Sequence, residues 1–226
     1  MSRMRWLVAI LLAVLAVVTA GCGKEGESGG SAATTPTTVA KPPPDPGREA
    51  MRALVDAART GDAAGVQDLL SKRVQRPAAV ARTLIRELRP YFPGYDVVVS
   101  ELIAENVGVV AVRRGKNAFA VPFRVEGGEL RAEPTGPVSI EILGPQPGAR
   151  EKVAQIGVEV HGRGSGSVAV LYADGVTLTP RVYPGPTSAT VFSNLEAPLT
   201  PGRHVAVAFA SRGGYPAARA WTFVAR

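Results

Sequence analysis

The hydrophobic pattern of the chain changes its period once, near Gly94, and this change constrains the fold more than any other feature. Between residues 48 and 93 the apolar side chains recur at helical spacing, beginning with Met51, Leu54 and Val55. After Gly94 they form short β-branched runs separated by turn residues, and no helical period returns. The pattern therefore predicts helices first and strands afterwards, in a chain long enough for two small domains.

Residues 47–135 are predicted to form an α+β domain. Its first helix covers residues 48–59 and its third runs from Pro77 to Pro90. Asp62 can cap the helix between them, whose apolar face extends to Val74. Antiparallel strands follow, and together these segments predict helices packed on one sheet.

The strand expected around residues 118–125 has a strict alternation. Phe119, Val121 and Phe123 share one face, which should be apolar and turned toward the helices. These three side chains can line a pocket for an apolar or amphiphilic ligand such as a lipid, or fill a closed core without a cavity. The closed core is the favoured alternative.

Residues 137–226 are predicted to form an all-β sandwich. About seven short strands alternate with turns every eight to twelve residues, and Asp174 with Gly175 is a hairpin signal. Pro134, Gly136 and Pro137 mark a joint, so this segment is expected to fold on its own.

The N-terminal segment has the order of a secretory signal. Two arginines precede an uncharged apolar run over residues 6–20, which ends in small residues and Cys22. Residues 18–22, with Gly21 before the cysteine, resemble the lipobox of bacterial lipoproteins. This resemblance implies cleavage between Gly21 and Cys22, fatty-acid modification of Cys22, and a lipid-anchored protein at the extracytoplasmic face of a bacterial membrane. The alternatives are an uncleaved helix and a plain secreted protein.

Residues 22–46 are predicted to be a tether between this anchor and the folded part. They are rich in glycine, serine and threonine and end in a proline run, a composition typical of flexible and then extended linkers. Removing residues 1–21 with Arg3 and Arg5 leaves 24 basic residues against 19 acidic ones, a net charge of +5. This mild excess favours anionic envelope partners, and no basic cluster interleaved with aromatic residues points to nucleic acid.

The order of elements in residues 47–135 resembles the cystatin-like α+β roll of the nuclear transport factor 2 superfamily. The helix pair broken by Gly61 and Asp62 and the closing hairpin over residues 123–130 carry this resemblance. It implies a concave sheet that binds ligands and is enzymatic in some members. Enzymatic members place Asp, His or Tyr in that pocket, and this segment has no histidine.

Charged residues of this first domain have two readings. The third helix carries a basic stripe at Arg82, Arg86 and Arg89, which is a candidate patch for anionic lipid or wall polymer and more simply a solvated helix face. The acidic residues Glu101, Glu105, Glu126 and Glu129 are expected to be surface charge.

The second domain resembles bacterial immunoglobulin-like domains through residues 145–149 and 199–204. The stretch after Leu199 is also similar to the last hairpin of the copper-resistance periplasmic family, although residues 211–216 lack its acidic and histidine ligands. His204 is expected to bond to nearby backbone, and His161 to lie at an exposed turn. No cluster of histidine, cysteine and acid is apparent for zinc or copper, so neither a metal nor a cofactor is expected.

Taken together, the sequence favours a non-catalytic envelope protein that binds another envelope protein, a wall polymer or a small apolar ligand. An enzyme that uses the pocket of the roll and a degenerate copper carrier are the alternatives. This expected binding role rests on the predicted lipid anchor and on the predicted fold class.

We expect labelled fatty acid to enter the wild-type protein in a bacterial expression host and to be lost from Cys22→Ala, because the cysteine sulfur is the acceptor of the lipid. Gel fluorescence and detergent partitioning measure this. A mature chain that begins at another residue and partitions into water would contradict the anchor.

Overall fold

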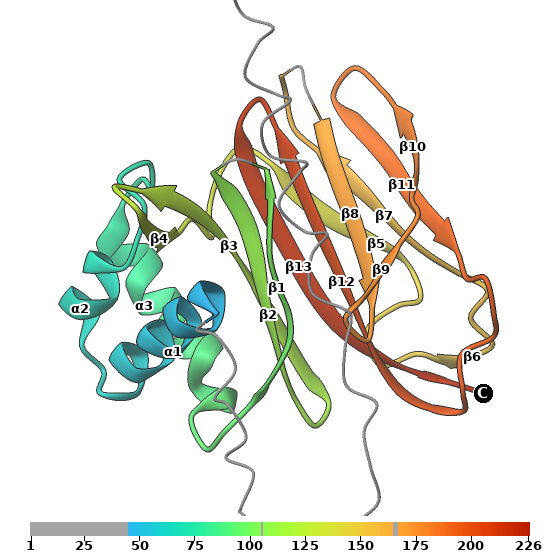
Figure 1. The fold of residues 1–226 in the computed structure, drawn as a ribbon, viewed down its shortest axis with the longest axis horizontal. Coiled ribbons are helices and arrows are strands. Elements are labelled where there is room, and N and C mark those ends of the chain that lie inside the picture. The colour runs from blue at the N-terminus through green and yellow to red at the C-terminus, as the bar shows by residue number, and fades with distance from the viewer. Residues whose placement is uncertain (1–44, 105, 165–166) are drawn as a thin grey trace, which may run out of the picture. The chain divides into compact units, whose positions relative to one another are not determined.

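The computed structural model describes residues 45–226 apart from 105, 165 and 166, and residues 43–226 form one compact unit. Gly21, Cys22 and the predicted tether up to residue 44 lie outside the described residues. None of the described helices is both long and apolar enough to cross a membrane. The unit is mostly β-sheet, with helices at its N-terminal side (Figure 1).

The elements follow one another in the expected order of helices and then strands. They are α1 (Pro46–Arg59), α2 (Ala63–Asp68), α3 (Pro77–Leu88), the short 3-10 helix η1 (Arg89–Tyr91), β1 (Asp96–Ala104), β2 (Val107–Arg114), β3 (Asn117–Glu126), β4 (Glu129–Ala132), β5 (Ser139–Gly144), β6 (Arg150–Glu151), β7 (Gln155–His161), β8 (Ser167–Ala173), β9 (Val176–Leu178), β10 (Arg181–Pro184), β11 (Ser188–Asn194), β12 (Gly202–Arg212) and β13 (Tyr215–Ala225).

Three sheets form from these strands. Sheet A is the antiparallel meander β1-β2-β3-β4, sheet B has the order β10-β11-β7-β5, and sheet C has the order β6-β13-β12-β8-β9. All pairs are antiparallel except β6 with β13. The predicted turn at Asp174 and Gly175 joins β8 to β9.

Helix α1 begins where a side chain satisfies its free amides. Asp45 accepts hydrogen bonds from the backbone N–H groups of Gly47 and Arg48 at 3.0 and 3.1 Å. The Ser100 hydroxyl on β1 donates to the same carboxylate at 2.6 Å, so the cap also ties the helix to sheet A. Burial raises the pKa of Asp45, but these hydrogen bonds outweigh it and hold the pKa below its usual value.

The second helix is shorter than the apolar pattern predicted. It ends at Asp68, although the expected face extends to Val74. Leu70 instead pairs with Ala132 of β4, and the backbone N–H of Ser71 donates to the Ala132 carbonyl at 2.8 Å. This pairing with the sheet takes the place of further helical hydrogen bonds, while Val74 stays buried in the core.

The first core lies between the helices and sheet A. Met51, Leu54 and Leu84 from the helices are at most 1% exposed and pack with Val121 and Phe123 of β3. Phe119 packs against the same cluster and is partly buried. The alternating face of β3 therefore points toward the helices, as its sequence predicted.

The second core fills the space between sheets B and C. Ile156 and Val158 of β7 meet Leu171, Trp221 and Phe223 of sheet C. Figure 1 shows the two sheets face to face. This arrangement is a two-layer sandwich around one core.

A third core joins sheet A to sheet C and was not predicted from the sequence. Val109 and Ala111 of β2 pack with Val207 and Phe209 of β12, each at most 1% exposed. Tyr172 of β8 is fully buried here, and its hydroxyl donates to the Glu101 carboxylate on β1 at 2.7 Å. Both sheets are therefore covered on two faces, and apolar burial across this joint holds the two predicted domains together.

Strand β12 divides its side chains between two cores. Val205, Val207 and Phe209 face sheet A, whereas the alanines at 206, 208 and 210 face sheet B. Small side chains suit the second side because Trp221 and Phe223 already occupy that space.

We expect Phe209→Ala to lower the free energy of unfolding by about 3–5 kcal/mol, because it opens a cavity in the third core. Val176→Ala, at a position that is 65% exposed, is the matched control and should change it by less than about 0.5 kcal/mol. Urea unfolding of both variants measures the difference. A small effect of Phe209→Ala would contradict a packed joint.

Independent folding of residues 137–226 stays a prediction. The third core adds that the isolated segment would expose Val205, Val207 and Phe209.

Candidate anion-binding cleft

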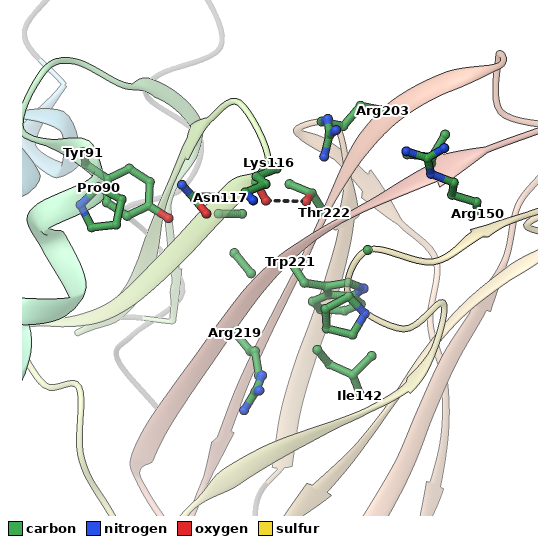
Figure 2. A pocket seen from close by; sticks show the side chains of 15 residues that line it. Pro90, Tyr91, Lys116, Asn117, Ile142, Arg150, Arg203, Arg219, Trp221 and Thr222 are labelled. Carbon is green, nitrogen blue, oxygen red and sulfur yellow. Dashed lines mark hydrogen bonds between the residues drawn. The ribbon is translucent and has the colours of Figure 1, made fainter.

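The tip of the β2–β3 hairpin is held against strand β13 of sheet C. The Thr222 hydroxyl donates to the Lys116 carbonyl oxygen at 2.7 Å, and Thr222 is 5% exposed (Figure 2). On the other side of the hairpin, a guanidinium nitrogen of Arg114 donates to the Pro90 carbonyl at 3.0 Å. These bonds fix the hairpin tip between η1 and sheet C.

A cleft of about 510 Å³ lies where these elements meet. Residues of η1 and the hairpin tip form one wall, and residues of sheet C with the β5–β6 loop form the other. The lining consists of Pro90, Tyr91, Lys116, Asn117, Ala118, Ile142, Pro147, Gly148, Arg150, Arg203, Arg219, Ala220, Trp221, Thr222 and Val224.

The strand register places two of its arginines in one row. Val224 of β13 pairs with Arg203 of β12 on one side and with Arg150 of β6 on the other. Residues that are paired across a sheet project from the same face, so both arginines flank Val224. Two strand spacings separate their backbones by roughly 9.5 Å.

Lys116 completes a group of three cations at this end of the cleft, and Figure 2 shows it near Thr222 with Arg203 and Arg150 beyond. Arg219 lies apart from them, beside Ile142 and Trp221. We call Lys116, Arg150 and Arg203 the cationic triad. All three are exposed, so their charges can reach a ligand in the cleft.

No acidic residue lines the cleft, and no carboxylate in the described ranges lies within 4 Å of a charged nitrogen of the triad or of Arg219. Six described arginines elsewhere do form such pairs, among them Arg48 with Asp45 and Arg113 with Asp96, whereas those of the α3 stripe do not. Gathering like charges without a counter-charge raises the local positive potential. The cleft can therefore hold an anionic group.

Apart from Arg219, the remaining polar side chains of the cleft are neutral. Trp221 is 3% exposed and its indole N–H donates to the Pro145 carbonyl at 2.8 Å, so the ring is fixed in the wall. Burial raises the pKa of Tyr91 to about 12, so its phenol stays uncharged at neutral pH. These groups shape the cleft without reducing its positive charge.

The candidate pocket residues from the sequence lie elsewhere. Val121 is fully buried and Phe123 is 2% exposed, and both belong with Phe119 to the first core. None of the three lines the cleft described above. They serve packing between sheet A and the helices.

The basic stripe of α3 is exposed and does not line the cleft. Arg82, Arg86 and Arg89 all face solvent, as the amphipathic pattern predicted. Arg89 directly precedes Pro90, so the stripe ends at the rim of the cleft.

The glutamates of the first domain make structural contacts. Glu101 accepts the Tyr172 hydrogen bond, Glu126 accepts from the Ser71 hydroxyl at 2.6 Å, and Glu129 pairs with Arg131. Glu105 lies outside the described residues.

The cationic triad was not found from the sequence because its members come from three separate segments. Lys116 stands at a hairpin tip, Arg150 on a two-residue strand and Arg203 near the start of β12. No local spacing connects them. The one signal in the sequence is an absence. None of the three cations has an acidic residue at a helical or cross-strand pairing position.

His204 is buried and bonded at both ring nitrogens. Nδ1 lies 2.6 Å from the Asp174 carboxylate and Nε2 lies 2.7 Å from the Thr200 carbonyl, which confirms the expected bond to nearby backbone. Both partners are acceptors, so the ring donates twice when it is protonated. Burial lowers the pKa of His204, but the bonds to Asp174 and Thr200 outweigh it and raise the pKa above its usual value.

Comparison with known proteins gives no family. No protein-family model matches the sequence, and no curated protein matches it. Among solved structures, PcoC, a methionine-rich copper resistance protein from Escherichia coli, aligns with 38% of this chain and 98% of its own length, at 21% sequence identity and a TM-score of 0.28. A superposition this loose carries no argument about fold or function.

The raised pKa of His204 predicts a pH dependence of stability. A histidine whose folded-state pKa exceeds its unfolded value of about 6.5 stabilises the fold fully below that value, and the contribution is lost as pH rises through the folded-state pKa. We therefore expect the wild type to lose stability over this range more steeply than Asp174→Asn. Asparagine tolerates the positive φ of 49° at this position, so the turn is kept. Urea unfolding between pH 5.5 and 8.5 measures both proteins, and parallel profiles would contradict the ion pair.

Proposed function

We propose that the mature protein is held at the extracytoplasmic face of a bacterial membrane by lipid on Cys22 and binds an anionic envelope polymer in the cleft that carries the cationic triad. The observation that carries the binding role is a group of three cations that no carboxylate in the described ranges balances. The order of leader, apolar run and cysteine supports the anchor. A net charge of +5 without the leader agrees with an anionic partner.

The fold proposed for this protein is a cystatin-like roll followed by an immunoglobulin-like sandwich. Helices that cover one face of sheet A support the roll, and sheets B and C around one core support the sandwich. The other face of sheet A is occupied by sheet C rather than open to a ligand. That face of the roll is therefore not available to a ligand, and we place the proposed binding in the cleft at the joint.

A polymer with repeated anionic groups fits the cleft better than a single small anion. Each exposed ion pair contributes only about 0.2–1 kcal/mol, so one contact gives negligible affinity. Arg150 and Arg203 stand on the strands that flank β13, with their backbones roughly 9.5 Å apart, so they can contact two neighbouring anionic groups of one polymer. Successive phosphates or carboxylates of a wall polymer could engage them in turn, and the contacts would add through effective concentration.

The lining of the cleft favours binding over acid–base catalysis. Among the residues that line it, none is Asp, Glu, His or Cys. Burial raises the pKa of Tyr91, the tyrosine of the cleft, away from neutral pH. The lysine and arginines of the cleft offer positive charge and hydrogen-bond donors. These groups can hold an anion, but they supply no general base suited to neutral pH.

We expect the Arg150→Gln, Arg203→Gln double variant to bind a short poly(glycerol phosphate) chain roughly tenfold more weakly than the wild type, because two ion pairs are lost. Isothermal titration at low salt measures this. Affinity of the wild type should also fall as salt is raised to about 0.5 M, since exposed charges are then screened.

Arg181→Gln is the matched control, because Arg181 is an exposed arginine on sheet B away from the cleft. It should bind the polymer like the wild type. Arg181→Gln removes one charge and the double variant removes two, so a loss of binding free energy in Arg181→Gln of half that in the double variant would show attraction by net charge alone. That result would overturn the cleft as the site, as would tight binding by the double variant.

A further inference from the structure

Two carboxylates and an imidazole meet on the outer face of sheet B, a grouping that the sequence did not indicate. Glu141 of β5 stands directly opposite Glu159 of β7, and His161 follows two residues after Glu159 on the same face. One potential ligand atom from each residue lies within 4.8 Å of the other two. The three residues stand on two neighbouring strands, so the register sets the spacing of their backbones.

The distances within this group suit a shared metal ion. His161 Nε2 lies 3.3 Å from a Glu141 oxygen and 3.9 Å from a Glu159 oxygen. Ligands on a tetrahedral ion with bonds of about 2.0–2.1 Å are separated by about 3.3–3.4 Å. The first separation therefore already matches, and small side-chain rotations would bring the third ligand in.

The electrostatics of the sheet also favour a cation here. Like charges directly opposite one another on a sheet face are destabilising, and Glu141 and Glu159 form such a pair. An ion between the two carboxylates would reverse this repulsion. The imidazole adds a nitrogen ligand, which magnesium and calcium seldom use and which zinc and other first-row divalent ions prefer.

We propose that Glu141, Glu159 and His161 form a surface site for a divalent first-row transition ion of the zinc type. The side chains of Glu141 and His161 are 67% and 42% exposed, so the remaining coordination positions are open to water or to a group from a partner. The second histidine, His204, takes no part because both of its ring nitrogens are bonded. This site is separate from the cleft and does not rest on its function.

The competing explanation is that the His161 ring simply lies between the two glutamates, offsetting part of their charge, and no metal binds. The variant His161→Arg distinguishes this explanation from a metal site, because arginine keeps a positive charge and does not ligate metal. Glu141→Gln is a second test that removes one carboxylate. Glu196→Gln, an exposed glutamate in the loop after β11, is the matched control.

The experiment is a titration of the chelator-treated full chain with ZnCl₂ by calorimetry, with Co²⁺ absorption in the visible range as a second readout. All proteins carry Cys22→Ser, so that a thiol cannot bind the ion, and circular dichroism verifies their folding. We expect one equivalent of Zn²⁺ to bind, a loss of roughly tenfold or more in affinity for His161→Arg and Glu141→Gln, and no change for Glu196→Gln. No saturable binding by the Cys22→Ser chain, or unchanged binding by His161→Arg, would overturn the site.

Discussion

The burial of sheet A against sheet C is the interaction on which the rest of the structure depends. Val109 and Ala111 on one side and Val207 and Phe209 on the other remove both sheets from water on their second faces. At the edge of this contact, a side chain at Gly175 would meet the Val98 carbonyl oxygen at 2.6 Å, so the β8–β9 turn can approach β1 only because it has a glycine there. Without this contact the hairpin tip would have no fixed position over β13.

Polar contacts at the edges of the third core fix the orientation of sheet A relative to sheet C. Arg124 forms a buried ion pair with Glu133 at 2.5 Å and also donates to the Gly214 carbonyl in the β12–β13 turn. Arg73 bonds to the same carbonyl and stacks over the Tyr215 ring. A buried pair of this kind adds little net stability but fixes one arrangement. Hydrogen bonds therefore hold the joint at both ends, because Thr222 donates to the Lys116 carbonyl at the opposite end.

The sequence predicted those parts of the fold that local periodicity controls. The alternation of Phe119, Val121 and Phe123 identified the face toward the helices, and the order of helices and strands followed from one change of period. The second helix was predicted too long because a pairing of Leu70 with Ala132 depends on distant residues. Strand β2 is buried over six residues because sheet C covers its second face, and this coverage was not predicted from the sequence. The cleft and the group at His161 could not be predicted, since their residues meet only through tertiary packing and strand register.

The joint creates the cationic cleft, in which we propose that an anionic polymer binds. Amide chemical shifts recorded during titration with poly(glycerol phosphate) test it most directly, because they report where the polymer lies. If the polymer lies in the cleft, the largest changes occur at Lys116, Arg150 and Arg203 and saturate together. Changes centred on the α3 stripe at Arg82 and Arg86, or spread evenly over the basic surface, would contradict it.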